Sequence, residues 1–148
     1  MKQFVVAILF AISMALIGCG SNSSSNASNV NGNWNASLVS GGNSPVFAFG
    51  TTMTVNNSNG SVAFTNFSFT TNSSCFTSGE TETGSFTLSG DFNGNVNGKF
   101  GMTVQSGTPS GNALALVGTV NGNTITGSWT LTGSSTCTGS GTFTMTKV

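Results

Sequence analysis

Few side chains in this chain can carry out acid–base, nucleophilic or metal chemistry. Among 148 residues there are 3 Lys or Arg, 3 Asp or Glu and 3 Cys, and there is no His or Tyr. Glu80 and Glu82 are two residues apart, so they share a face in an extended chain. Two carboxylates can serve as acid and base in glycoside cleavage. Because this pair stands at a loop edge with no predicted burial, we favour the alternative, a solvated pair.

The remaining residues also argue against catalysis. Serine nucleophiles need a base, and the chain has no histidine for that role. Lys99 or Lys147 can replace it only when desolvated, which nothing in the sequence indicates. The charged residues are also too few for a nucleic-acid groove, an acidic cation site or a polybasic lipid surface. We therefore predict a protein that is not an enzyme and has no cofactor and no nucleic-acid partner.

The N-terminal segment has the pattern of an export signal. Lys2 precedes the apolar run 4–17, and a polar Ser/Asn tract follows at 21–29. As a helix this run reaches only about 21 Å, whereas the hydrocarbon layer of a bilayer is about 30 Å thick. A signal peptide over residues 1–18 is therefore favoured over a membrane span. Residues 19–29 then form a flexible tether.

The end of the apolar run, Leu16-Ile17-Gly18-Cys19, resembles the lipobox of bacterial lipoproteins. The resemblance implies that Cys19 becomes the first residue of the mature protein and carries acyl lipid, such as palmitate, on its sulfur and its amine. Gly20 is not the aspartate that retains such proteins at the inner membrane. The implied location is therefore the bacterial cell envelope, anchored by lipid in the outer membrane. The alternative is an ordinary secretory signal in which the cysteine is incidental.

The other two cysteines, Cys75 and Cys137, form an even pair once Cys19 is lipidated. In an exported protein such a pair is most simply a disulfide. A metal site is the alternative, but two thiols without any histidine cannot complete a zinc shell. The sequence therefore predicts a Cys75–Cys137 disulfide and no metal site.

The segment 30–148 is predicted to be a single all-β domain. Apolar residues alternate with Thr, Ser or Asn in eight runs, and no run shows a helical period. The predicted strands span residues 32–39, 46–55, 61–70, 81–92, 96–105, 113–120, 124–132 and 139–147.

The connections between these strands alternate in length. Short turns are predicted at Asn59-Gly60, Asn93-Gly94 and Asn121-Gly122, since Asn-Gly between strands is a strong hairpin signal. The other connections are longer. This alternation predicts an antiparallel up-and-down meander whose eight strands close into a barrel and so remove exposed edges. An open β-sandwich is the alternative.

Two details concern strand register. The apolar phase of the third strand slips, which predicts a bulge near Thr65 and Asn66. Placing Leu88 beside Phe100 on one face requires a three-residue loop at 93–95.

Two triplets, Gly32-Asn33-Trp34 and Gly127-Ser128-Trp129, are similar to the Gly-x-Trp signature of calycins, the lipocalin and avidin-like barrels. The resemblance covers a few residues per strand and implies a barrel more than any ligand. The chain lacks the arginine that lipocalins pack over this tryptophan and the tyrosine that avidins place on their ligand. Each tryptophan is therefore either a core residue at a barrel end or a wall of a ligand site.

In such a barrel the long connections gather at one end, and the disulfide crosses its mouth. We predict non-enzymatic binding of a small apolar ligand or a glycan there. The alternative is a structural or interaction lipoprotein of the envelope with a packed core and no ligand. The candidate ligand-binding residues are Trp34, Phe47, Phe49, Phe76 and Trp129.

The run 113–117 offers apolar side chains to both faces of its strand. Its outward set consists either of Leu114 and Leu116 or of Ala115 and Val117. Such a patch suggests self-association, for which Leu114 and Leu116 are the first candidates. Alternatively, a neighbouring loop covers it.

Overall fold

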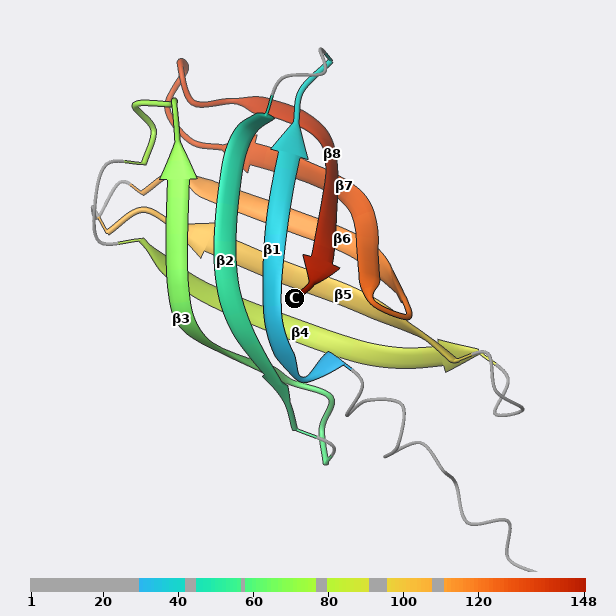
Figure 1. Ribbon diagram of the computed structural model, residues 1–148. Helices are drawn as coiled ribbons and strands as arrows, with labels where there is room; N and C mark the ends of the chain where they lie inside the picture. Colours follow the sequence, from blue (N-terminus) through green and yellow to red (C-terminus); the bar gives the residue numbers. More distant parts are fainter. Residues whose placement is uncertain (1–29, 42–44, 57, 77–79, 91–95, 108–110) are drawn as a thin grey trace, which may run out of the picture.

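The computed structural model describes residues 30–148 apart from 42–44, 57, 77–79, 91–95 and 108–110. The predicted signal peptide, Cys19, the tether and the Asn93-Gly94 turn lie outside the described residues. Eight strands follow one another along the chain (Figure 1). They are β1 (Gly32–Val39), β2 (Pro45–Val55), β3 (Val62–Thr71), β4 (Thr81–Gly90), β5 (Val96–Gln105), β6 (Ala113–Asn121), β7 (Thr124–Thr132) and β8 (Gly139–Lys147).

All eight strands belong to one antiparallel sheet in the order β3-β2-β1-β8-β7-β6-β5-β4. In Figure 1, β1–β3 stand upright in front and β4–β7 cross behind them, so the sheet curls round on itself. The described residues of the β3–β4 seam form one bridge, Ser61 to Ser85, and the Phe86 amide donates to the Gly60 carbonyl at 2.8 Å. The predicted meander is confirmed as a nearly closed barrel with one unsealed seam.

The strand bounds follow the predicted alternation closely. β1, β5, β7 and β8 match the prediction, and β4 is described up to Gly90, since residues 91 and 92 of its predicted range lie outside the described residues. The predicted bulge in β3 is also confirmed. The register between β2 and β3 shifts there, and Asn66 has a φ of 52°. The Thr51 hydroxyl donates to the Thr65 carbonyl at 3.1 Å, so the bulge leaves this carbonyl with a partner.

Two of the predicted Asn-Gly turns lie within the described residues. Gly60 has a φ of 69° and Gly122 a φ of 58°, whereas Asn59 and Asn121 keep negative φ. The glycine therefore supplies the left-handed residue of each turn, which it adopts without a side-chain clash.

The register between β4 and β5, which the sequence left open, differs by two residues from the pairing of Leu88 with Phe100. Leu88 lies opposite Gly98, and Phe86 lies opposite Phe100. A shift of two residues keeps every side chain on its face, so the alternation alone does not select the register. The Phe86 ring occupies the space that a Cβ on Gly98 would fill, and this close packing suits the observed pairing.

The barrel interior is filled by the inward-facing side chains of its strands. Most of the described apolar ones are buried, including Trp34, Leu38, Phe100, Ile125 and Met145, whereas the aromatic residues of β3 are partly buried. Several inward glycines leave room for aromatic rings, which would otherwise collide with a Cβ. They are Gly84 beneath Phe64, Gly98 beneath Phe86, Gly118 and Gly127 beneath Phe143, and Gly141 beneath Trp129.

The described residues contain no helix with the length and hydropathy that crossing a bilayer requires.

Candidate functional site

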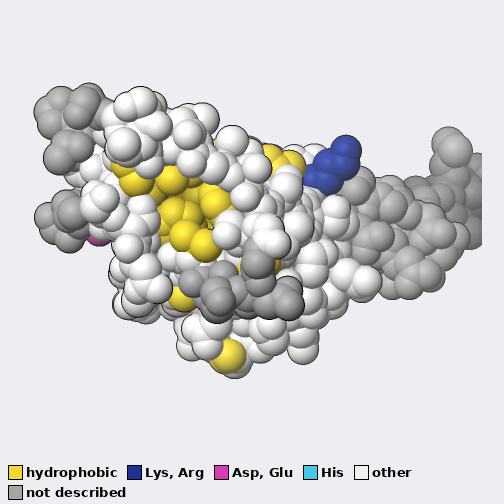
Figure 2. Space-filling model, turned by 90° about the horizontal axis from the view of Figure 1, so that it is seen from above, with side chains coloured by type: hydrophobic (Ala, Val, Ile, Leu, Met, Phe, Trp, Pro, Cys, Tyr) yellow, Lys and Arg dark blue, Asp and Glu magenta, His cyan; other side chains and the backbone are white. Residues whose placement is uncertain are grey.

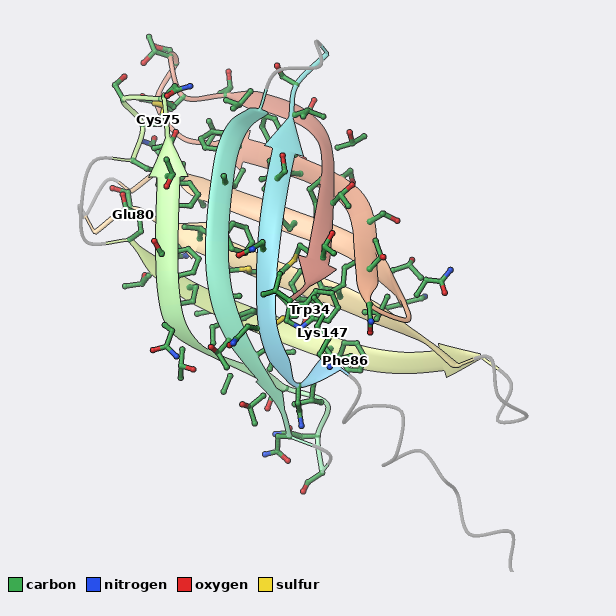
Figure 3. All side chains as sticks on the ribbon, in the orientation of Figure 1. Trp34, Cys75, Glu80, Phe86 and Lys147 are labelled. Carbon is green, nitrogen blue, oxygen red and sulfur yellow. A yellow bond between two sulfur atoms is a disulfide. The ribbon has the colours of Figure 1, made fainter. Side chains whose placement is uncertain are left out.

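The disulfide joins two of the long connections at one end of the barrel. Cys75 lies between β3 and β4 and Cys137 between β7 and β8, with an S–S distance of 2.05 Å and a Cα–Cα distance of 5.7 Å. The predicted pairing is confirmed. It closes a loop of 62 residues, and both cysteines are buried. Figure 3 shows Cys75 and Glu80 near this end, whereas Trp34, Phe86 and Lys147 lie toward the other.

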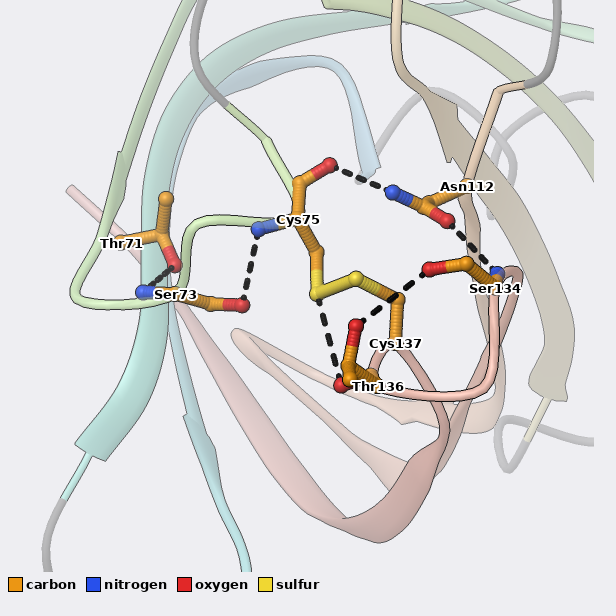
Figure 4. The surroundings of a disulfide bond; sticks show 7 residues. All are labelled: Thr71, Ser73, Cys75, Asn112, Ser134, Thr136 and Cys137. Carbon is orange, nitrogen blue, oxygen red and sulfur yellow. Dashed lines mark hydrogen bonds between the residues drawn. A yellow bond between two sulfur atoms is a disulfide. The ribbon is translucent and has the colours of Figure 1, made fainter.

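Asn112 connects the same loops by hydrogen bonds (Figure 4). Its side-chain amide donates to the Cys75 carbonyl at 2.9 Å, and its side-chain oxygen accepts from the Ser134 amide at 3.2 Å. Its own carbonyl accepts from the Ser106 amide at 3.0 Å. Three long connections are thus linked through one residue. Sequence reasoning missed Asn112, because an Asn in a long loop carries no signal of its partners.

Aromatic side chains pack directly beneath the disulfide. The Phe47 ring lies 5.8 Å from Phe69, 6.0 Å from Phe76 and 5.4 Å from Trp129, measured between ring centroids. Phe76 also meets Phe69 at 5.4 Å, nearly edge to face, a favourable geometry for aromatic pairs. The Trp129 indole N–H donates to the Val39 carbonyl at 2.9 Å, which ties β7 to the end of β1.

Above these rings lies a hollow of about 230 Å³, which we call the mouth hollow. Figure 2 looks onto this end and shows apolar side chains gathered in its centre, surrounded by polar atoms. No described residue of its lining is charged. Its floor is formed by Val46, Phe47, Trp129 and Leu131, and its rim carries the hydroxyl groups of Ser40, Ser73, Thr136, Thr138 and Ser140.

The five candidate ligand-binding residues do not form one group. Phe47 and Trp129 line the mouth hollow, and Phe76 packs against Phe47 beneath the disulfide. Phe49 lies further along β2, where its ring meets Phe67 at 5.5 Å. Trp34 lies toward the other end, with 0% of its surface exposed, and its indole N–H donates to the Val30 carbonyl at 2.7 Å.

None of the charged side chains that the structure describes lines the mouth hollow. Glu80 and Glu82 are partly buried near the start of β4, while Lys99 is exposed on β5. Glu82 occupies an inward-facing position, two residues before Gly84, whose Cα faces the Phe64 ring. Within the described residues, no three His, Cys, Asp or Glu side chains are grouped so that they could hold a metal ion.

The apolar strand β6 has one of its two alternative orientations. Leu114 and Leu116 are 0% and 1% exposed, so they belong to the core and cannot form a surface patch. The outward-facing residues are Ala115 and Val117, and Val117 is 66% exposed. The prediction that named the two leucines as the contact surface is therefore corrected, because the barrel interior takes the larger side chains.

Comparison of the chain with protein-family models, curated proteins and solved structures gives no match. The lipobox and the calycin signature stay predictions that rest on the residues quoted for them. The functional argument rests on the geometry of the mouth hollow and of the barrel wall.

Proposed function

We propose that the protein is a lipid-anchored protein of the bacterial cell envelope that binds a small neutral ligand, either apolar or the end of a glycan, in the mouth hollow. It binds this ligand without chemical conversion. One observation carries the proposal: an apolar floor with aromatic rings lies inside a rim of hydroxyl groups, and its described lining has no charge.

The lining indicates the kind of ligand. Apolar surface at the floor favours a C–H-rich or aromatic face, and the hydroxyl rim can exchange hydrogen bonds with polar groups at the edge of the ligand. The volume of about 230 Å³ is below the roughly 300 Å³ at which sites for drug-sized ligands begin. A single ring, such as one sugar residue, therefore suits the hollow better than a long lipid chain.

The position of Val30 indicates how an anchored barrel would be oriented. Val30, the first described residue, packs under Trp34, away from the disulfide and the mouth hollow. A lipid on Cys19 would therefore hold the barrel by the end that carries Trp34. The mouth hollow would face away from the membrane, where it can reach ligands outside the bilayer.

Filling the mouth hollow tests the binding proposal. A Cβ on Gly139 would stand 3.6 Å from the Trp129 ring, so Gly139→Leu places a side chain in the hollow without a backbone clash. We expect native mass spectrometry to find a bound extra mass on the unaltered protein, extracted gently from the envelope, and none on this variant. Thr144→Leu, on the exposed face of the same strand, is the matched control and keeps that mass.

A second candidate function has its own supporting observation. The interior is packed with buried side chains, which suits a structural or interaction protein without a ligand. Protein extracted in the same way that carries no bound mass, and that takes up neither neutral oligosaccharides nor apolar ring compounds, would contradict binding and favour this candidate.

A further inference from the structure

A second depression lies on the outer wall of the barrel, where β4, β5 and β6 run side by side. It has a volume of about 360 Å³, and we call it the wall furrow. Its floor includes Gly101, which stands between Ser85 on β4 and Val117 on β6 in the strand register. Thr83, Thr103 and Ala115 form the neighbouring row. None of these residues is charged.

Gly101 has no role in the backbone or the core that would require a glycine. Its φ is not positive, and a Cβ there would meet only the Ser85 hydroxyl, at 2.9 Å. By contrast, Gly84 and Gly98 make room for aromatic rings of the core. Glycine in a strand interior weakens the strand and often marks a place where another chain approaches closely. The missing side chain at Gly101 therefore accounts for the wall furrow.

Val117 stands directly beside this furrow. At 66% exposure it is the only large apolar side chain exposed among the strand residues whose burial is described. A protruding side chain thus lies next to a depression on the same face. A two-fold axis between Val117 and Gly101 would place each Val117 over the Gly101 of a second copy, since a two-fold contact pairs residue i with j and j with i.

We propose that the protein forms a two-fold homodimer in which Val117 of each copy enters the wall furrow of the other. The surrounding rows fit this arrangement. This axis runs parallel to the strands, between β5 and β6, and sets Ser85 opposite Ser128 and Thr103 opposite Ala115, so hydroxyl groups meet a hydroxyl group or a small side chain. Lys99 falls opposite Thr119 and not opposite its own copy, so like charges are kept apart.

The exchange of the two side chains gives a direct test. Gly101→Val fills the furrow, and Val117→Gly removes the protrusion. Each single variant is expected to weaken dimerisation about tenfold or more, measured by sedimentation velocity of the full chain in mild detergent across a concentration series. The double variant Gly101→Val with Val117→Gly places a valine opposite a glycine again, and we expect it to restore the dimer.

Ser37→Val, on the exposed face of β1, is the matched control and should dimerise like the unaltered chain. Circular dichroism confirms that each variant is folded. An unaltered chain that stays monomeric at every concentration would overturn the proposal. So would a double variant that dimerises no better than the single ones, because only the two-fold geometry predicts the rescue.

Discussion

Single residues at the long-loop end hold together connections that the sheet itself does not join. The disulfide links the β3–β4 and β7–β8 connections, and Asn112 adds the β5–β6 connection through its hydrogen bonds. β3 and β4 are not joined by a continuous ladder of backbone hydrogen bonds, so these loop contacts help to hold the two strands together. The mouth hollow thus owes its shape to a few side chains of the loops.

Removing the disulfide tests this role. Replacing Cys75 and Cys137 together by Ala is expected to lower the free energy of unfolding by about 4 kcal/mol, because the crosslink restricts a long loop in the unfolded chain. Urea unfolding followed by fluorescence measures the change. A reductant should destabilise the unaltered chain and leave the double variant unaffected. Alkylation of both cysteines in the native protein without reductant would contradict the disulfide itself.

At the scale of the strands, glycines and aromatic rings are matched across the interior. The inward glycines of β4 and β5 lie beneath Phe64 and Phe86. The barrel interior is too narrow to hold a side chain at every inward position, and the glycines leave the space that the large rings need. The two edge strands also limit unwanted pairing, since β3 carries the bulge at Asn66 and β4 has Glu82 at an inward position.

This matching predicts opposite outcomes for two glycines of one strand. Gly98→Val would collide with the Phe86 ring and is expected to lower the free energy of unfolding by about 1–3 kcal/mol. Gly101→Val points outward, and we expect a change within about 0.5 kcal/mol. Thermal unfolding of both variants measures the two changes in stability. Equal destabilisation would mean that β5 does not face the interior as described.

At the scale of the whole molecule, the two ends of the barrel differ. The Trp34–Val30 hydrogen bond belongs to one end, and the disulfide and the mouth hollow belong to the other. A protein anchored through Cys19 would present its hollow away from the lipid and its wall furrow sideways. Dimerisation along the membrane plane and ligand binding above it are therefore compatible.

The anchor has a separate test. Cys19→Ser is expected to release the protein from the membrane fraction, because the acyl chains supply the membrane affinity, about 0.8 kcal/mol for each buried methylene. Fractionation of the envelope, followed by mass spectrometry of the N-terminus, measures the result. The variant without Cys75 and Cys137 serves as control and should stay anchored. A Cys19→Ser protein that is still processed and membrane-bound would contradict the lipoprotein prediction.

The sequence by itself determined the strands, the bulge and the disulfide pairing. Alternation with a period of two marks each strand and its two faces, and the two cysteines remaining for a disulfide leave one pairing. These properties are local or depend on counting. They can therefore be predicted without knowledge of the contacts between distant strands.

Only the tertiary structure decided which strands meet and which face of β6 turns inward. A shift of two residues preserves the alternation, so the sequence did not decide whether Leu88 pairs with Phe100 or with Gly98, its partner in the structure. Likewise, both faces of β6 are apolar, and only the packed interior shows that Leu114 and Leu116 fill it while Val117 is exposed. The position of the seam between β3 and β4, and the partners of Asn112, depend in the same way on contacts between distant residues.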